Sequence, residues 1–507
     1  MFQFPSTRRL SKDASASGVE TPGSPTHQAV EQGRETPGVE TPGSRPVFTL
    51  PDGWSARRLR SIAQMRVSNV DKNTLNDEVP IRLCNYVDVY KRDVITAGLP
   101  FMRATATPEE VRLFGLERGD VIITKDSETY QDIGVPAYVA STADDLVCGY
   151  HLAILRPYPF VMSGEYLYWA LRTTAVAHQL RVAARGVTRF GLTQGDIKSA
   201  WVPVPPPDEQ AAIVKYLAHA TTRIDKTIAA KRRLIALLEE QRDAIADEYV
   251  TGRIEPSLRD TGLTWLPTVP EGWDVCPLKR HWRIVDCKHL TVPFIEDGIP
   301  LASIRQAQRF FLDLSEAKRT DRANYENLIE GGRRPSRGDL IYCRNVSVGA
   351  AAVVSTDEVF ALGQDVCLLH SRDQSAVFLN HFLRSSAMRA QLEMLLVGST
   401  FRRINVEDVR GLLTVVPPTH RQEELSAQIA ERTAPMLRAV ERAAREIVLL
   451  QEFRTRLIAD VVTGQVDVRG IASTLPDIDP TTAWAVPDPD DPDPGASDPD
   501  NDDVPDA

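Results

Sequence analysis

Two short segments of this 507-residue chain hold local clusters of arginine. One is Gly331-Gly-Arg-Arg-Pro-Ser-Arg-Gly338 and the other is the pair Arg402-Arg403. A guanidinium group carries a permanent charge and a planar fork of donors, which suits it to binding phosphate groups. A solvated charged loop is the alternative, because most surface charges have no further role. The chemistry that these residues offer is anion binding.

Residue types that would support catalysis or metal binding are not arranged for either. The dipeptide Gly-Lys is absent, which excludes the P-loop of ATP-driven motors. The chain also lacks His-Glu-x-x-His, Gly-x-Ser-x-Gly and the [Asp/Asn]-Pro-Pro-[Tyr/Phe] motif with which adenine methyltransferases hold a flipped base. Its 6 cysteines form no Cys-x-x-Cys pair, so neither a disulfide framework nor a zinc site is indicated. We therefore predict a protein with no catalytic residues and no bound metal.

A long internal repeat organises the rest of the chain. Motifs near the start of the repeat recur at an offset of 219 residues and later ones at 212, always in the same order. The matching pairs are Pro51-Asp-Gly-Trp54 with Pro270-Glu-Gly-Trp273, Arg118-Gly-Asp-Val-Ile122 with Arg337-Gly-Asp-Leu-Ile341, Val204-Pro-Pro206 with Val416-Pro-Pro418, Gln210 with Gln422, and Val250-Thr-Gly252 with Val462-Thr-Gly464. A repeat of this kind predicts two copies of one fold.

Each copy begins with a globular domain, which we place at 48–207 and 264–418. Apolar runs after each Gly-Asp turn, at 121–124 and 340–343, are typical of buried strands, and helical patterns are few. The fold class predicted for the chain is therefore α+β, with two tandem α/β domains.

A long helix is predicted after each domain, at 208–255 and 419–467. Apolar residues recur at three- and four-residue steps in both segments and fall at corresponding positions. The predicted pairing residues are Ile224, Ile228, Ile235, Leu238 and Ile245 in the first helix, and Met436, Val440, Ile447, Leu450 and Leu457 in the second. Because such helices are too long for a compact domain, we expect them to pair as an antiparallel coiled coil. The seam could equally serve a partner protein.

The two ends of the chain differ from the repeat in composition. Residues 1–47 are rich in Pro, Gly, Ser and Thr, so we predict a disordered extension. Residues 471–507 contain no Lys or Arg, and they contain 11 aspartates between Asp477 and Asp506. These aspartates account for the acidity of the whole chain, because its formal net charge is -10 with them and +1 without them. We predict a disordered acidic tail there. No apolar run is long enough to cross a membrane, so the expected location is the cytoplasm.

The combined architecture resembles the specificity subunit of type I restriction-modification systems. The resemblance covers about residues 48 to 470 and rests on the duplicated motifs above, together with Gly186-Val-Thr188 and its counterpart Gly398-Ser-Thr400. In that family the globular domains are target recognition domains that each read half of a bipartite DNA sequence. The long helices hold the two domains apart and dock two methyltransferase subunits.

The resemblance implies a non-catalytic subunit whose partners are double-stranded DNA, two methyltransferase subunits and restriction subunits that act as motor and nuclease. It implies no cofactor here, with S-adenosylmethionine, ATP and magnesium bound by the partner subunits. Because the two domains differ outside their shared motifs, the target should be asymmetric. A non-DNA adaptor, with two duplicated protein-binding domains on a coiled coil, is the alternative.

The overall charge of the domains gives DNA binding little support. Residues 49–207 contain 18 Lys and Arg and 17 Asp and Glu, and residues 264–418 contain 19 Lys and Arg and 18 Asp and Glu. Local cations must then do the binding, and side chains with forked or paired donors suit base edges. The candidate DNA contacts are Lys125, Arg185, Thr188, Arg189, Arg333, Arg334, Arg344, Asn345, Thr400, Arg402 and Arg403.

Overall fold

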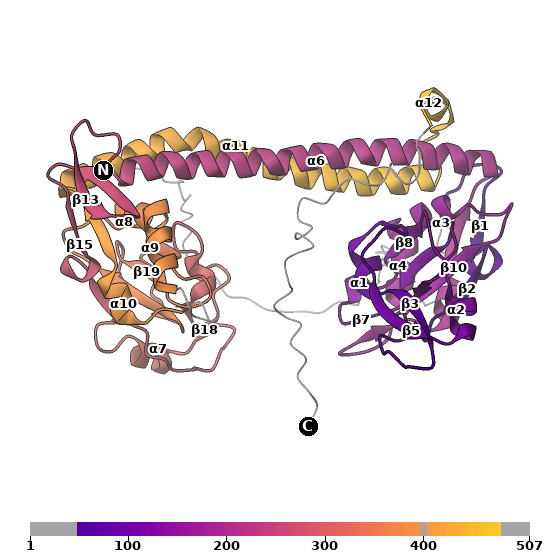
Figure 1. Ribbon diagram of the computed structural model, residues 1–507, viewed down its shortest axis with the longest axis horizontal. Helices are drawn as coiled ribbons and strands as arrows, with labels where there is room; N and C mark the ends of the chain where they lie inside the picture. The colour runs from indigo at the N-terminus through magenta and orange to yellow at the C-terminus, as the bar shows by residue number, and fades with distance from the viewer. Residues whose placement is uncertain (1–47, 397–402, 478–507) are drawn as a thin grey trace, which may run out of the picture.

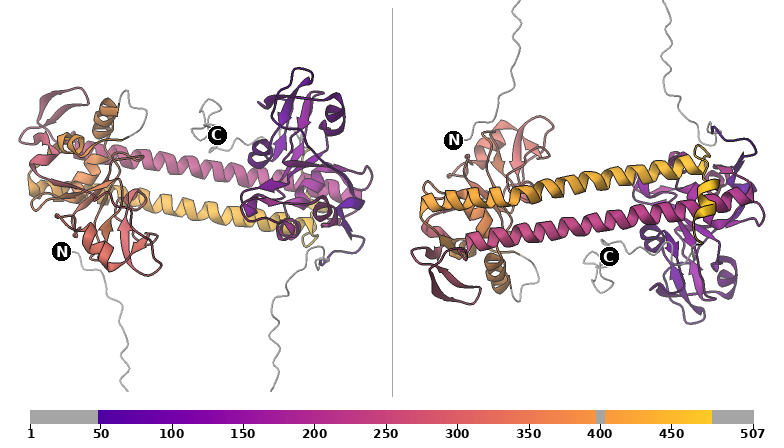
Figure 2. Two further views of the ribbon diagram at one scale, coloured as in Figure 1. Left: turned by 90° about the horizontal axis from the view of Figure 1, so that it is seen from below. Right: turned by 90° about the horizontal axis from the view of Figure 1, so that it is seen from above.

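Two long helices lie side by side along the molecule, with one globular domain at each end (Figures 1 and 2). The computed structural model describes residues 48–396 and 403–477, so the predicted N-terminal extension and most of the acidic tail lie outside the described residues. Helix α6 spans Pro207–Val250 and helix α11 spans Thr419–Val462, each 44 residues and thus about 65 Å long. Figure 1 shows both domains on the same side of this helix pair.

The helices run antiparallel, which confirms the predicted coiled coil. Lys231 is paired with Glu446, whereas Asp225, six residues earlier, is paired with Arg454, which lies later in α11. Of the predicted pairing residues, Ile224 and Ile228 are buried, and the other eight are half-buried. A seam between only two helices leaves each side chain open to water on one side, so partial burial is what this geometry produces.

The two domains share one sheet topology, as the repeat predicted. The first has a mixed sheet in the order β2-β10-β6-β8-β4, and the second has β16-β22-β19-β20. These strands are β2 (Ala63–Val67), β4 (Val94–Ile95), β6 (Val121–Thr124), β8 (Pro136–Val139), β10 (Leu152–Pro157), β16 (Arg283–Asp286), β19 (Leu340–Cys343), β20 (Ala351–Val353) and β22 (Val366–His370).

A second small sheet lies in each domain, with one parallel and one antiparallel pairing. Its order is β5-β3-β9 in the first domain and β18-β17-β21 in the second. The strands are β3 (Val79–Cys84), β5 (Met102–Ala106), β9 (Leu146–Cys148), β17 (Ile299–Ala302), β18 (Arg319–Thr320) and β21 (Ala361–Leu362). A two-stranded pair joins the start of each domain to its end, β1 (Ser55–Arg58) with β12 (Trp201–Val204) and β15 (Asp274–Pro277) with β23 (Leu413–Val416).

Short helices cover these sheets. In the first domain they are α1 (Tyr86–Lys91), α2 (Pro108–Phe114), α3 (Gly164–Leu171), α4 (Thr174–Ala183) and α5 (Gln194–Ser199). In the second they are α7 (Arg322–Leu328), α8 (Ala376–Leu383), α9 (Ser386–Leu396) and α10 (Val406–Gly411). Within the described residues, no helix combines the length and the apolar character that crossing a membrane requires.

The ends of both long helices are part of the domain cores. Leu217 of α6 and Val461 of α11 are fully buried in the core of the first domain. Val250 of α6 and Leu425 of α11 are equally buried in the core of the second. Each domain therefore packs on both helices, and this fixes the position of one domain relative to the other.

A glutamine repeats the same contacts at each domain junction. The side chain of Gln210 accepts a hydrogen bond from the Ser163 N–H at 2.9 Å and donates to the Pro205 carbonyl at 3.0 Å. Gln422 accepts from the Ser375 N–H at 2.9 Å and donates to the Pro417 carbonyl at 2.8 Å. These buried bonds explain why the Val-Pro-Pro segment is followed by a glutamine in both copies.

Both long helices end earlier than the predicted 255 and 467. Gly252 and Gly464 have φ values of +74° and +73°, and their N–H groups bond the carbonyls of Tyr249 and Val461. The next N–H in each case bonds a carbonyl five residues back, which completes a Schellman motif and stops the helix. After Gly252 the chain forms a hairpin of β13 (Leu258–Leu263) and β14 (Leu266–Pro270), so the second domain also begins before residue 264.

The start of the predicted acidic tail is structured, which corrects its boundary of 471. Helix α12 (Arg469–Thr474) packs on α6, with Val468 and Ala472 buried. Beyond it, the Lys215 ammonium bonds the Asp477 carboxylate at 2.6 Å. Figure 1 shows α12 on the side of α6 that faces away from the domains.

The Val-Thr-Gly turns pack on the Pro-x-Gly-Trp motifs, and this generates a stability prediction. A Cβ at Gly464 would lie 2.4 Å from Pro51 Cγ, and the φ of +73° disfavours any side chain. We expect Gly464→Ala to lower the free energy of unfolding by about 1–3 kcal/mol, measured by urea denaturation. Gly470→Ala is the matched control, since its Cβ would meet open space in α12. Equal stability of the two variants would contradict the close packing.

Candidate nucleic-acid interface

Two loops meet at the same place in each domain. In the first domain the loop after β6 meets the Gly-x-Thr loop, because the Leu192 N–H bonds the Lys125 carbonyl at 3.0 Å. In the second, the Ile404 N–H bonds the Arg344 carbonyl at 3.0 Å. We call each pair of loops the two-loop site of its domain.

Short strands shape the site of the first domain. Strand β7 (Asp126–Ser127) pairs with β11 (Phe190–Gly191), and Arg185 and Gly191 exchange two backbone hydrogen bonds of 3.0 and 2.9 Å. Gly186 has a φ of +139°, and a Cβ there would lie 1.8 Å from the Arg189 carbonyl oxygen. The tight turn therefore requires glycine, and it exposes Arg185, Thr188 and Arg189. Figure 1 shows β7 at the edge of this domain that faces the other domain.

The cations of this site have partners within the domain. Asp126 forms a close ion pair with Lys125 and lies 3.4 Å from His151 Nδ1, while Arg189 lies 2.7 Å from His151 Nε2. Burial lowers the pKa of His151 below its usual 6.5, and the neighbouring Arg189 and Lys125 lower it further, against the opposing effect of Asp126. A neutral ring can accept a hydrogen bond from Arg189. Sequence reasoning identified Lys125 and Arg189 but missed Asp126 and His151, which no motif marks.

The equivalent site in the second domain is built around an internal ion pair. Arg344 is 3% exposed, and its guanidinium lies 2.6 Å from the Asp286 carboxylate and 3.4 Å from His289 Nε2. Its Nε is buried and has no hydrogen-bond partner among the described residues. Arg344 thus lies beneath the surface, and we expect it to hold the loop in place rather than to reach a base.

The other DNA contacts predicted in the second domain differ in their positions, and two of them lie outside the described residues. Arg333 donates to the Asp286 carbonyl at 2.8 Å, so the structure brings Arg333 and Arg344 together, whereas Arg334 is exposed. Asn345 forms a β-bridge with Arg403, whose side chain lies 3.7 Å from Asp365. Thr400 and Arg402 lie outside the described residues.

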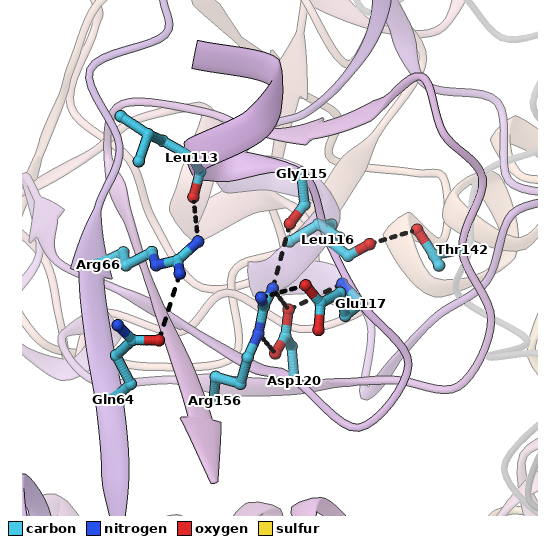
Figure 3. A network of polar contacts seen from close by, with 9 residues as sticks. All are labelled: Gln64, Arg66, Leu113, Gly115, Leu116, Glu117, Asp120, Thr142 and Arg156. Atoms are coloured by element: carbon cyan, nitrogen blue, oxygen red, sulfur yellow. Dashed lines mark hydrogen bonds and ion pairs between the residues drawn. The ribbon is translucent and has the colours of Figure 1, made fainter. Parts of the chain in front are cut away.

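The Arg-Gly-Asp motif positions the strand that leads into each site. Asp120 is 1% exposed and receives two hydrogen bonds of 2.8 Å from the Arg156 guanidinium, while the Glu117 N–H bonds the same carboxylate at 2.8 Å (Figure 3). In the second domain Asp339 is 2% exposed, and it lies 2.6 Å from His370 Nδ1. A buried carboxylate at the strand entry therefore fixes where β6 and β19 begin.

The burial of Arg344 generates a second prediction. Arg344→Met would leave Asp286 without its charged partner, so we expect the free energy of unfolding to fall by about 2–4 kcal/mol in urea denaturation. Arg403→Met is the control, because that side chain is 55% exposed and its loss should cost about 0.5 kcal/mol or less. Similar losses in both variants would show that Arg344 is no more structural than Arg403.

The chain is similar in sequence to a family of known proteins. Residues 51–240 match the family model of the type I restriction modification DNA specificity domain. The chain is 20% identical to the predicted type I restriction enzyme MjaX specificity subunit of Methanocaldococcus jannaschii over 430 residues, which cover 83% of this chain and 95% of that protein.

A solved structure shares the fold of this chain. A chain from a structural study of complex assembly and conformational transition in a type I restriction-modification system matches with a TM-score of 0.55 at 15% identity, over 83% of this chain and all of that one. The HsdS subunit of Thermoanaerobacter tengcongensis matches with a TM-score of 0.42 at 17% identity, over 83% of this chain and 99% of that one. The family match over residues 51–240 and the relative matched along 95% of its length make the chain similar to the specificity subunits of type I restriction-modification systems, and its fold agrees with this similarity.

Proposed function

We propose that this specificity subunit reads an asymmetric, two-part DNA sequence, with one target recognition domain on each half. The observation that carries the proposal is the recurrence of the two-loop site in both domains, at the ends of one rigid helix pair. From Leu217 in the first core to Tyr249 in the second, α6 advances about 48 Å. That exceeds one turn of B-DNA, about 34 Å, so unread base pairs must separate the half-sites.

The chemistry of modification and cleavage then belongs to partner subunits. Methyltransferase subunits would supply S-adenosylmethionine and the pocket for a flipped adenine. Motor-nuclease subunits would supply ATP hydrolysis and magnesium. This chain would recognise the target sequence and serve as the scaffold, and we assign no cofactor to it.

Two exposed leucines support the docking of two identical partners. Leu237 of α6 and Leu449 of α11 are separated by the repeat offset of 212 residues, and they are 53% and 62% exposed. Further exposed apolar side chains lie nearby along the same helices, namely Leu234, Val448 and Phe453. Because the helices are antiparallel copies of one another, the leucines occupy corresponding positions, as two copies of one methyltransferase subunit would require.

The direct test is to co-express the chain with its methyltransferase subunit in a methylation-free host and to map N6-methyladenine by single-molecule sequencing. We expect an asymmetric motif in two parts with a fixed gap. A stable complex that adds no methylation would count against the proposal and favour the protein-adaptor alternative.

Exposed cations of the first domain should contribute to DNA affinity through phosphate contact. Arg189→Ala should reduce the slope of log affinity against log salt concentration by about 1, measured by fluorescence anisotropy with the target duplex. Arg112→Ala is the control, because Arg112 is also exposed but lies on α2, which Figure 1 shows away from the inner edge of the domain. An unchanged slope for Arg189→Ala would remove this residue from the interface.

Docking at the two leucines predicts a change in stoichiometry. Leu237→Asp or Leu449→Asp alone should reduce the complex from two methyltransferase subunits to one, and the double variant should bind none, measured by native mass spectrometry. Burying a leucine side chain in the interface contributes about 1.5–3 kcal/mol to the free energy of binding, and burying an unpaired charge there costs more than that. Leu237→Met and Leu449→Met keep an apolar side chain and should retain both subunits. Two bound subunits in the double aspartate variant would place the docking surface elsewhere.

A further inference from the structure

Val346 is held in a conformation that valine rarely adopts. It follows the buried strand β19 and Arg344, its φ is +58°, and its side chain is 71% exposed. A branched Cβ makes the left-handed region especially unfavourable. The surrounding turn nevertheless fixes it, since the Ser347 N–H bonds the Asn345 carbonyl at 2.6 Å and the Gly349 N–H bonds the Cys343 carbonyl at 3.3 Å. Strain of this kind persists where structure around a ligand site imposes it.

Val187 is an exposed valine in the two-loop site of the first domain. It lies in the middle of the Gly-x-Thr loop and is 95% exposed, between the exposed Arg185 and Arg189. The loop is closed by the backbone bonds between Arg185 and Gly191, so the valine is displayed by a defined turn.

The two valines occupy the same kind of site, although they come from different loops. Val346 belongs to the loop that follows β19, and Val187 belongs to the Gly-x-Thr loop of the first domain. In the second domain the loop after β19 meets Arg403 and Ile404. Single exposed apolar side chains are common on protein surfaces and mean little by themselves. These two differ because each is a largely exposed residue of a defined turn, among the residues that the structure describes, with Arg189 in the same loop as Val187 and Arg403 bridged to Asn345 beside Val346.

A short apolar side chain that lies near cations is suited to contact the major-groove edge of a thymine. In the major groove only thymine presents a methyl group, and apolar side chains recognise it by contact, while nearby arginines bind phosphates and purine edges. Side chains that wedge between base pairs are longer than valine, typically Phe, Leu, Ile or Met. The short, branched side chain therefore favours contact with a methyl group over insertion.

We propose that Val187 and Val346 each contact the C5-methyl group of one thymine, so that each half of the target contains a base recognised through its methyl group. This inference rests on the proposed function. Burying one methyl group corresponds to about a fourfold change in affinity.

The test replaces each thymine of the mapped target, one at a time, with deoxyuridine, which lacks only the methyl group. Affinity is measured for the full chain in complex with its methyltransferase subunits. We expect one position in each half-site at which deoxyuridine weakens binding about fourfold. Val346→Ala should abolish that sensitivity only in the half-site of the second domain, and Val187→Ala only in the half-site of the first, so each variant is the control for the other.

The variant Val346→Gly separates loss of the methyl contact from loss of folding. Glycine readily adopts the positive φ at this position, and it lacks the apolar side chain that would contact the base. It should bind the subunits as the wild-type chain does and show no response to deoxyuridine in its half-site. A wild-type complex that binds its target but tolerates deoxyuridine at every position would overturn the inference and leave the proposed function intact. The same holds if the sensitivity survives in the valine variants, or if a half-site contains no thymine on either strand. A complex that binds no duplex would instead refute the proposed function.

Discussion

The pairing of α6 with α11 is the interaction on which the rest of the molecule depends. Two helices in water cover only part of an apolar seam, which is why Ile235 and Ile447 stay half-buried. The ends of the same helices are buried fully, because Leu217 and Val461 belong to one domain core, and Val250 and Leu425 to the other. The seam and both cores are therefore coupled. A change in the register of the helices would disturb all three, and register in turn fixes the spacing of the two-loop sites.

The duplicated motifs acquire a physical meaning from this coupling. Pro270 and Trp273 pack on Gly252, where the first long helix ends, so the second domain begins on that helix. Pro51 and Trp54 pack in the same way on Gly464, at the end of the second long helix. The start of the first domain thus closes onto the end of the repeat, and each copy of the unit completes the other. This closure explains why the same four-residue motif is needed twice.

The sequence predicts the scaffold better than the site, and the reason is the range of the interactions. Periodicity is a local signal, so the helix seam follows from the chain itself, although the helices end at Val250 and Val462, five residues before the predicted 255 and 467. The roles of the cations depend on partners that are distant in sequence. Lys125 and Arg344 occupy equivalent positions, yet Asp286, 58 residues away, draws Arg344 beneath the surface, whereas Lys125 pairs with the adjacent Asp126. Residue type and position were visible in the sequence, but burial was not.

The pairing of cations with nearby carboxylates also explains how nearly neutral domains suit selective DNA binding. Lys125, Arg344 and Arg403 each have an acidic partner at 4 Å or less, so these three side chains present little unbalanced positive charge in the free protein. Non-specific affinity for DNA grows with the number of phosphates that free cations neutralise. A site whose cations are internally paired gains less from any passing phosphate and depends more on contacts to base edges. We infer that the balance of 18 cations and 17 anions in the first domain favours discrimination between sequences over tight binding to all of them.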